Sequence, residues 1–435
     1  MQFGSKKGSV LLLFGDILIF VVALWLTLFS RAFKLPSWEV FSLNLVPFLF
    51  IFATWLLVFF IADLYGRPAT LFRRRLPQTI FNTLLINSGL AIAFFYFLPY
   101  FGVTPKTILF IDLFWSFVLI FAWRRYMVTS LLRGRRERIY FACQGQEVVE
   151  LKEEIKNNPQ YNSVVMEGEK SDLAKSHVTM VVINPYDSNE SSVKDFYQLI
   201  FKGVRFLAVD DFYEEVFERV PLSLIDERWF LENVTNSPKV IYDSFKRAID
   251  FAIAFVLAII SLPIYPVVWI LMRFFDSGPM FSFQKRVGQN NKVARLSKFR
   301  TMTNANDGGR WGDDKKNEVT KLGAILRKTR WDEIPQLWNV LWGNVSLVGP
   351  RPEFPEAVKN YSEAIPFYGV RHLVKPGLSG WAQVYQENHP HHGVDINETR
   401  NKLSYDLYYI KNRSLWLDIS IALKTIKILI LSKGK

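Results

Sequence analysis

The sequence predicts a membrane protein with three parts: an α-helical membrane bundle, a Rossmann-like α/β insert, and a mainly α-helical domain with a re-entrant membrane helix. Three observations predict this fold class. Residues 1–132 hold four long apolar runs, residues 133–235 alternate short β-branched runs with helical patterns, and residues 240–435 begin with an apolar run interrupted by prolines. Composition agrees, because 50% of the 435 residues are hydrophobic and only 21% are charged.

The four apolar runs are each close to the roughly 20 residues that cross the hydrocarbon core of a bilayer. They are Val10–Phe29, Phe41–Ala62, Leu84–Phe101 and Ile108–Trp123. The residues that interrupt them are Gly15, Asp16, Asn44, Pro47, Asn87 and Asp112. We interpret these as buried packing or capping positions rather than an ion pathway, because isolated carboxylates in membrane segments usually face the bundle.

Flanking charge predicts that both ends of the bundle are cytoplasmic. The basic residues on that side are Lys6, Lys7, Arg67, Arg73, Arg74, Arg75, Arg124, Arg125, Arg133, Arg135, Arg136 and Arg138. The two opposite loops hold only Arg31, Lys34 and Lys106. The first run is not expected to be a cleaved signal peptide, because it is long and no small-residue cleavage site follows it.

The insert reads as a small parallel-sheet domain. Strands are expected at Ile139–Cys143, Val164–Met166, Val178–Ile183 and Val204–Val209, and helices at Glu147–Lys156 and Ser192–Lys202. The first turn, residues 142–146, has one glycine where a dinucleotide-binding turn needs three. We therefore expect a regulatory or dimerising role for the insert. This turn also counts against a membrane-tethered NAD-dependent dehydratase. Cys143 is the single cysteine, so no internal disulfide can form, as is typical of a reducing compartment.

A further apolar run, Ala248–Met272, carries Pro263 and Pro266 near its middle, and proline breaks the hydrogen-bond ladder of a helix. Basic residues flank it on both sides: Lys239, Lys246, Arg247, Arg273, Lys285 and Arg286. A straight spanning helix is the alternative, but it would place the rest of the chain outside, against this charge pattern. A re-entrant helix over about residues 246–273, bent at the prolines, satisfies both observations.

An Asp-Glu pair before a proline is the candidate catalytic centre. Pro335 suits the first turn of a helix that runs through Leu341, so Asp332 and Glu333 should lie just before or at its N-terminus. The helix dipole there favours carboxylates and bound phosphate. Adjacent residues do not share a helix face, so one carboxylate could attack a phosphorus while its neighbour holds a divalent cation.

Transfer of a phosphoryl group between anions needs positive charge, from Mg²⁺ and from basic side chains. The basic residues close to the pair in sequence are Arg286, Lys298, Arg300, Arg330 and Arg351. An Asp-Glu pair by itself most often caps a helix, and arginines mostly solvate surfaces. The net charge of +13 indicates anionic partners such as lipid, phosphorylated substrates or nucleic acid, but topology and phosphate binding largely account for the arginines.

Residues from about Tyr242 to Leu431 resemble the bacterial sugar transferase family, also called monotopic phosphoglycosyl transferases. The segments that carry the resemblance are Lys246-Arg247…Asp250, residues 298–302, the block TRWDEIPQLWNVLWGNVSLVGPRPE, residues 375–384 and residues 405–415. The N-terminal runs and the insert resemble those of large members that make exopolysaccharide or O-antigen. The resemblance implies that a UDP-sugar and undecaprenyl phosphate give undecaprenyl-diphosphate-sugar and UMP, with Mg²⁺ as cofactor. It also implies the bacterial inner membrane, a cytoplasmic catalytic domain, membrane lipids as partners and no nucleic acid.

By position, the resemblance implies that Asp332 is the nucleophile of a covalent phosphosugar intermediate and that Glu333, with Asp332, binds Mg²⁺. Further candidates for binding phosphate or nucleotide are Lys298, Arg300, Arg330, Pro350, Arg351, Pro352 and Asp406. Pro263 would be the break in the re-entrant helix. The sugar, the polymer and whether the chain forms a homodimer are left open.

Two alternatives stand beside this reading. A non-enzymatic membrane scaffold or regulator of polysaccharide assembly would leave the ordered motifs unexplained. His389, His391 and His392 could hold a transition metal, although a solvated loop is the expectation.

The last apolar stretch, Leu415–Leu431, is expected to be a helix at the membrane interface.

Overall fold

The chain divides into two compact units, Met1–Val216 and Phe217–Lys435. In the computed structural model the described residues are 6–62, 64–65, 76–97, 106–132, 137–158, 161, 163–167, 178–186, 196–197, 199–234, 239–276, 278–303, 318–385 and 395–430. The histidine cluster and several of the flanking arginines lie outside them: Arg67, Arg73, Arg74, Arg75, Arg133, Arg135, Arg136, His389, His391 and His392.

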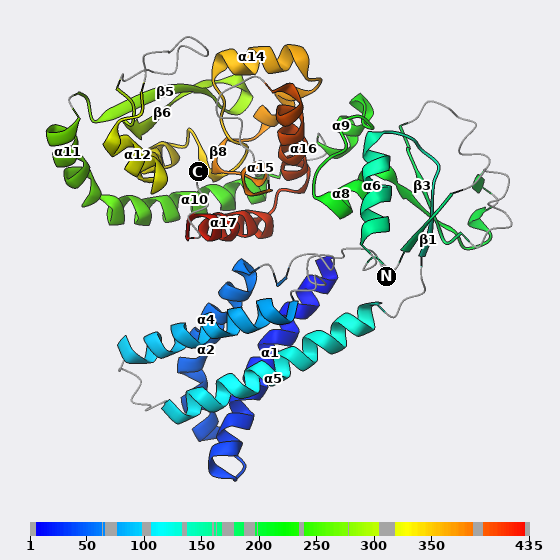
Figure 1. Ribbon diagram of the computed structural model, residues 1–435, viewed down its shortest axis with the longest axis vertical. Helices are drawn as coiled ribbons and strands as arrows, with labels where there is room; N and C mark the ends of the chain where they lie inside the picture. The colour runs from blue at the N-terminus through cyan, green and yellow to red at the C-terminus, as the bar shows by residue number, and fades with distance from the viewer. Residues whose placement is uncertain are drawn as a thin grey trace. The chain divides into compact units, whose positions relative to one another are not determined.

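Where the structure describes the start of the first unit, a helix covers each of the predicted apolar runs (Figure 1). They are α1 (Lys6–Ala32), α2 (Trp38–Ile61), α4 (Leu76–Phe97) and α5 (Lys106–Leu132). Leu11–Ala32 and α2 are long and apolar enough to cross a membrane, whereas the apolar part of α4 is the shorter stretch Ile80–Phe95. Within the described residues a helix is therefore confirmed at each predicted run, and membrane crossing by any of these helices stays a prediction.

Polar residues that interrupt the apolar runs are buried inside this bundle. Asp16 is fully buried and lies 2.5 Å from the Arg124 guanidinium, and the Tyr65 hydroxyl donates to it at 2.8 Å. Gly15 makes room for Trp123, because an added Cβ would lie 2.2 Å from the indole ring. Asp112 is also fully buried. The expected burial of these positions is confirmed, and a packing role rather than an ion pathway stays a prediction.

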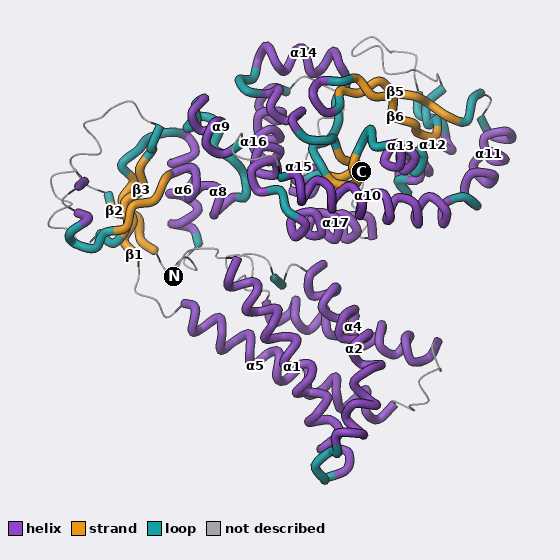
Figure 2. The backbone as a smooth tube through the Cα atoms, turned by 180° about the vertical axis from the view of Figure 1, so that it is seen from behind, coloured by secondary structure: helices purple, strands orange, loops and turns teal. Residues whose placement is uncertain are grey.

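A four-stranded parallel sheet follows in the order β2-β1-β3-β4 (Figure 2). The strands are β1 (Glu137–Phe141), β2 (Ser163–Met166), β3 (Met180–Ile183) and β4 (Arg205–Ala208), all within a few residues of prediction. Helices α6 (Gln146–Asn157) and α8 (Val209–Phe217) pack on β1 through Phe141, which contacts Lys152 and Phe212. The helix expected over residues 192–202 lies partly outside the described residues.

The backbone conformation of the turn from β1 to α6 explains its single glycine. Gly145, the residue before α6, has a φ of +149°, which L side chains rarely adopt. This glycine is required to make the turn, whatever the insert binds. The expectation that the insert binds no dinucleotide stays a prediction.

The second unit is mainly helical, as predicted. Its helices are α9 (Glu227–Asn233), α10 (Val240–Ser261), α11 (Ile264–Phe275), α12 (Lys321–Lys328), α13 (Gln336–Trp342), α14 (Pro355–Ala364), α15 (Trp381–Tyr385), α16 (Ile396–Asn412) and α17 (Leu415–Ile430). Short 3₁₀ turns are η4 (Gln289–Asn291), η5 (Trp331–Glu333) and η6 (Tyr368–Leu373). Strands β5 (Phe281–Val287) and β6 (Val293–Phe299) pair antiparallel, and β7 (Ser346–Val348) and β8 (Gly377–Ser379) pair parallel.

The second unit begins earlier in the chain than residue 240. The Val220 amide donates to the Ser404 carbonyl at 3.1 Å, and the Trp381 indole donates to the Glu218 carbonyl at 2.9 Å. The phenyl rings of Phe230 and Phe367 have centroids 4.4 Å apart. The segment that contains α9 therefore packs within the second unit, against its C-terminal part.

The apolar run before the candidate centre is broken at Pro263, as predicted. Helices α10 and α11 meet there at an angle of 51°, which fits either a broken span or a re-entrant loop. One face of α10 is buried against the rest of the unit: Asp250, Ala254, Ala258 and Ser261. The opposite face leaves large apolar side chains exposed, including Phe251, Phe255, Ile259 and Ile260. An exposed apolar face of this size is typical of a membrane-contacting surface.

The buried pair of Asp16 and Arg124 generates a prediction for the bundle. We expect Asp16→Ala to destabilise the bundle by about 3–5 kcal/mol, because the mutation leaves the buried Arg124 charge without its carboxylate. The thermal unfolding midpoint of the detergent-solubilised protein measures this effect. The double variant Asp16→Ala/Arg124→Ala should be less destabilised than the sum of the two single variants. Additive effects would contradict the pairing.

Candidate active site

The carboxylate pair lies in a short 3₁₀ turn directly before α13, where the sequence predicts it. Arg330 adopts the left-handed region with φ of 59°, and this reverses the chain between α12 and η5. Pro335, with φ of −60°, caps the start of α13. The predicted helix start at Pro335 is thereby confirmed. The turn that carries Asp332 and Glu333 thus lies between α12 and α13, which fix it at both ends.

The two carboxylates have different partners. Glu333 lies 2.7 Å from the Lys298 ammonium and 3.5 Å from the Arg351 guanidinium. Asp332 is 8% exposed, and its nearest recorded cation is Lys298 at 4.0 Å. Asp332 is thus buried with a weaker counter-charge than its neighbour, and a difference in role between the two side chains stays a prediction.

Their protonation follows from these surroundings. Burial raises the pKa of Asp332, and the attraction of Lys298 offsets this rise only in part. Burial would also raise the pKa of Glu333, but the charges of Lys298 and Arg351 outweigh it and hold the pKa well below its ordinary value. Glu333 is therefore ionised at neutral pH. Arg330 also lowers the pKa of both carboxyl groups through its charge, so the structure places it close to the pair.

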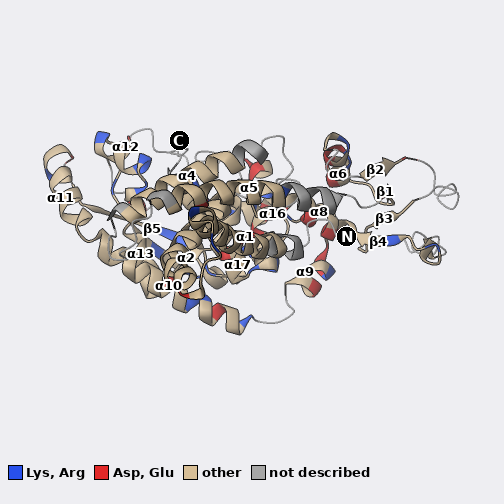
Figure 3. Cartoon of the chain, turned by 90° about the horizontal axis from the view of Figure 1, so that it is seen from below, with Lys and Arg blue, Asp and Glu red and all other residues tan. Residues whose placement is uncertain are grey.

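A narrow cleft opens beside Glu333. It is lined by Arg286, Leu296, Lys298, Glu333, Gln336, Arg351, Pro352, Gly377 and Leu378. Three of these residues are cations, and Figure 3 colours Lys and Arg positions blue on the nearby strand β5. Burial lowers the pKa of Arg286 to about 10 and also lowers that of Lys298. Positive charge held in a partly buried cleft suits a phosphorylated ligand.

The turn formed by residues 350–352 is fixed through its backbone. The Gly377 amide donates to the Pro350 carbonyl at 2.9 Å, and Arg371 donates to the Arg351 carbonyl at 3.0 Å. Arg286 donates to the Pro352 carbonyl at 3.3 Å. All three backbone carbonyls of the turn thus accept hydrogen bonds from residues outside the turn. The Arg351 side chain remains 30% exposed and reaches toward Glu333.

The strands beneath this turn approach each other so closely that they require glycine. An added Cβ at Gly349 would lie 2.5 Å from the Lys375 carbonyl oxygen, and one at Gly377 would lie 2.1 Å from the Gly349 nitrogen. Real Cβ atoms do not approach backbone so closely. These glycines therefore serve the packing of β7 on β8, which sets the position of the turn.

Not every predicted site residue lines the cleft. Asp332, Arg330 and Pro350 are absent from its described lining but adjoin residues that form it, whereas Arg300 and Asp406 have their contacts elsewhere. Among the described residues Arg300 does not line the cleft; it is 2% exposed and donates to the carbonyls of Pro279, Met302 and Thr303. Its guanidinium holds the chain around β5 and β6 together. Asp406 is 1% exposed and pairs with Arg371 at 2.7 Å. Its connection to the cleft is indirect, through the Arg371 bond to the Arg351 carbonyl.

Sequence reasoning missed the ionic cluster behind the turn. Glu353 pairs with Lys402 and lies 4.0 Å from both Arg286 and Arg371. Burial would raise the pKa of Glu353, but Lys402 and Arg371 outweigh it and lower the pKa to about 2. Glu353 directly follows the proline-arginine-proline turn, which was a usable signal. The sequence gives no signal for Arg371 and Lys402, because only folding brings them close to Glu353.

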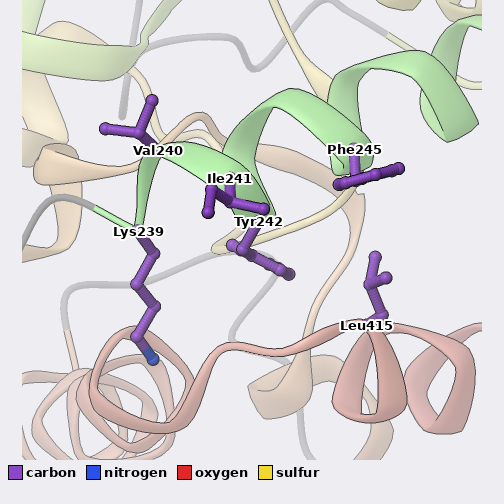
Figure 4. Close-up of a pocket in the computed structure, with 6 residues that line it drawn as sticks. All are labelled: Lys239, Val240, Ile241, Tyr242, Phe245 and Leu415. Carbon is purple, nitrogen blue, oxygen red and sulfur yellow. The ribbon is translucent and has the colours of Figure 1, made fainter.

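A second, larger hollow lies where α10 and α17 begin (Figure 4). It is lined by Lys239, Val240, Ile241, Tyr242, Phe245 and Leu415. The Lys239 ammonium donates to the carbonyls of Lys411 and Arg413, at 3.2 and 2.9 Å. The hollow brings no carboxylate into its lining. Its described lining therefore offers no carboxylate to attack a phosphorus or hold a divalent cation, unlike the cleft beside Glu333.

Asp332 and Glu333 form a donor set that fits Mg²⁺. This ion prefers oxygen ligands and is usually held by one or two carboxylates together with substrate phosphates. Glu333 is ionised, as a ligand must be, and Asp332 is adjacent. No cluster of three or more His, Cys, Asp or Glu side chains occurs among the described residues, so the phosphates of a substrate would have to complete the coordination.

The fold and site define a bacterial sugar transferase. The profile of the family described as "Bacterial sugar transferase" matches residues 241–432. The chain is 36% identical over 194 residues to the UDP-glucose:undecaprenyl-phosphate glucose-1-phosphate transferase of Caulobacter vibrioides, covering 43% of this chain and 71% of the relative. The chain belongs to this family.

Two other relatives extend the comparison. The UDP-N-acetylgalactosamine-undecaprenyl-phosphate N-acetylgalactosaminephosphotransferase of Aeromonas hydrophila is 40% identical over 199 residues, covering 45% of this chain and 46% of the relative. Exopolysaccharide production protein ExoY of Sinorhizobium fredii is 33% identical over 224 residues, covering 47% of this chain and 94% of the relative. The match thus spans less than half the length of the Aeromonas relative.

Glu353 generates a prediction about pH. Because the pKa of Glu353 in the folded protein is lowered to about 2, below the ordinary 4.5, its contribution to stability is full above pH 4.5 and is lost as the pH falls toward 2. We expect Glu353→Gln to cost about 3 kcal/mol at pH 7 and to flatten the decline in stability below pH 4.5. Thermal unfolding between pH 7 and pH 3 measures both. The exposed Glu363→Gln on α14 is the control, and an equal acid slope in both variants would contradict the assignment.

Proposed function

We propose that this protein transfers a sugar 1-phosphate from a UDP-sugar to undecaprenyl phosphate, giving undecaprenyl-diphosphate-sugar and UMP, and so initiates synthesis of an exopolysaccharide, capsule or O-antigen. The observation that carries the proposal is the pair of adjacent carboxylates beside a cation-lined cleft: Glu333 lines the cleft and is ion-paired, and buried Asp332 next to it has a weaker counter-charge. The activities for which the relatives from Caulobacter and Aeromonas are named support the same class of substrates.

In the first half-reaction a carboxylate oxygen of Asp332 attacks the phosphorus that bears the sugar. A bond from Asp332 to this phosphorus forms, the bond to the bridging oxygen breaks, and UMP leaves with the bonding electrons. In the second half-reaction an oxygen of undecaprenyl phosphate attacks the same phosphorus. The bond to Asp332 then breaks and the carboxylate is restored, so the cycle is balanced without a further reactant.

The cations around the pair have separate roles in this proposal. Lys298 neutralises Glu333 and faces Asp332, so it can also neutralise the transferred phosphoryl group. Arg351, on a turn whose carbonyls are all held, presents a rigid guanidinium to a nucleotide phosphate. Arg330 adds positive charge beside Asp332. Asp406 is a positioning residue, because it acts through Arg371.

Glu333, with Asp332, is the proposed holder of Mg²⁺. Bound there, the ion would neutralise the diphosphate and stabilise the leaving UMP. The ionised state of Glu333 and its place in the lining of the cleft support this assignment. Removal of the ion by a chelator is expected to stop UMP release.

The proposed location is the bacterial inner membrane, with residues 1–132 as the membrane bundle and residues 240–435 as a catalytic domain facing the cytoplasm. The bend at Pro263 would return the chain to the side from which it entered. This arrangement has a chemical reason. The lipid acceptor lies in the bilayer while the nucleotide sugar is dissolved in water, so a site at the interface can meet both in turn.

The nucleophile is tested by substitution. We expect Asp332→Asn to lower UMP release from UDP-sugars by about three orders of magnitude or more, because an amide cannot form the acyl phosphate. The assay scans a panel of UDP-sugars with undecaprenyl phosphate in nanodiscs. Glu363→Gln should keep wild-type turnover. Normal turnover by Asp332→Asn would remove it from this role, and absence of UMP from the wild-type protein with every sugar would favour a scaffold.

Topology is tested by cysteine labelling in a Cys143→Ala background. We expect a cysteine at the exposed Lys285, beyond the bent helix pair, to resist a membrane-impermeant maleimide in spheroplasts and to react after permeabilisation. A cysteine at Lys34, in the loop between α1 and α2, should react in intact spheroplasts. Labelling of Lys285→Cys from outside would overturn the re-entrant arrangement.

A further inference from the structure

We propose that Asn339 is a positioning residue of the active site, which fixes strand β6 at the distance from which Lys298 reaches the carboxylate pair. The inference rests on the proposed function for its catalytic meaning. Its structural content concerns only the coupling between α13 and β6. Asn339 touches neither carboxylate in any recorded contact, so it would act through Lys298.

The Asn339 side chain is 1% exposed and uses both ends of its amide. Its Oδ1 accepts hydrogen bonds from the Ser297 amide and the Ser297 hydroxyl, both at 3.0 Å. Its Nδ2 donates to the Arg295 carbonyl at 2.9 Å. A buried asparagine with three such bonds is costly to replace, because its partners would be left unsatisfied.

The hydrogen bonds of Asn339 to β6 resemble those that a neighbouring strand would make. Strand β6 pairs with β5 along one edge, and within this two-stranded sheet its other edge has no strand partner. A primary amide offers an acceptor and a donor side by side, as a peptide group does. Asn339 therefore pairs with the free edge of β6 at Arg295 and Ser297, two residues apart, as a strand residue would.

The position of this contact links the two halves of the site. Lys298 follows Ser297 directly on β6, and Asn339 is on the helix that begins just after Glu333. The Lys298 to Glu333 distance of 2.7 Å therefore depends on the register between α13 and β6. Val340, beside Asn339, packs in one apolar cluster with Leu296. Apolar packing is not directional, so it holds the two elements together without fixing this register.

The test measures the reactivity of Lys298 toward an amine-acylating reagent, N-hydroxysuccinimidyl acetate, by peptide mass spectrometry of the full chain in detergent. In the wild-type protein the ion pair with Glu333 protects Lys298. We expect Asn339→Ala to raise the rate of Lys298 acetylation about tenfold. Ser404→Ala, which removes a buried hydroxyl bonded to the Val220 carbonyl on another helix, is the matched control and should leave the rate unchanged.

A second variant covers the case in which Asn339→Ala does not fold. Ser297→Ala removes one of the three bonds and leaves α13 intact, and we expect it to raise Lys298 acetylation about threefold. If Asn339→Ala folds and its Lys298 is acetylated at the wild-type rate, the proposal is overturned. If Asn339→Ala does not fold, a wild-type rate of Lys298 acetylation in Ser297→Ala overturns it.

Kinetics then separate positioning from stability. We expect Asn339→Ala and Lys298→Met each to lower kcat for UMP release at least tenfold, and the double variant to fall little further. Ser404→Ala should change neither KM nor kcat per folded molecule. Independent, multiplying losses in the double variant would contradict action through Lys298. If wild-type protein releases no UMP, the proposed function fails, while the acetylation result still decides whether Asn339 fixes β6.

Discussion

The ion pairing of Glu333 with Lys298 and Arg351 is the interaction on which the rest of the site depends. Two adjacent carboxylates would repel each other and become protonated in a buried site unless nearby cations compensated them. Here the compensation is unequal. Glu333 is paired closely and is held ionised, whereas burial raises the pKa of Asp332. One short turn thereby carries two carboxyl groups of different chemistry, of which Glu333 lines the cleft.

The cations that produce this difference come from separate segments, each held by its own structure. Lys298 lies on β6, whose free edge is bonded by Asn339, and Arg351 lies on a turn whose three carbonyls are held from outside. Behind that turn, Glu353 joins Arg286, Arg371 and Lys402 in one ionic cluster. Buried charges are tolerated only when paired, so this cluster specifies the position of the turn more than it adds stability.

Helix α10 connects the apolar surface of the second unit to the site. Its Arg247 donates to the carbonyls of Val340 and Leu341 at the end of α13, at 2.6 and 2.7 Å. Its Asp250 accepts from the Ser346 hydroxyl at 2.6 Å, at the start of β7. The opposite face of the same helix is exposed and apolar. One face of α10 is thus suited to contact lipid, and the other face contacts the elements that carry the site.

The sequence by itself determined the elements: the four N-terminal helices, the parallel strands, the break at Pro263 and the helix start at Pro335 all follow from hydrophobic period and local backbone preference. It also indicated the carboxylate pair and the family. Only the tertiary structure decided which cations meet that pair. Arg300 is near it in sequence yet binds carbonyls elsewhere, while Arg371 and Asp406, distant in sequence, support the turn that carries Arg351. The physical reason is that local pattern fixes the conformation of a segment, whereas ion pairs depend on side chains that only packing brings within a few ångströms.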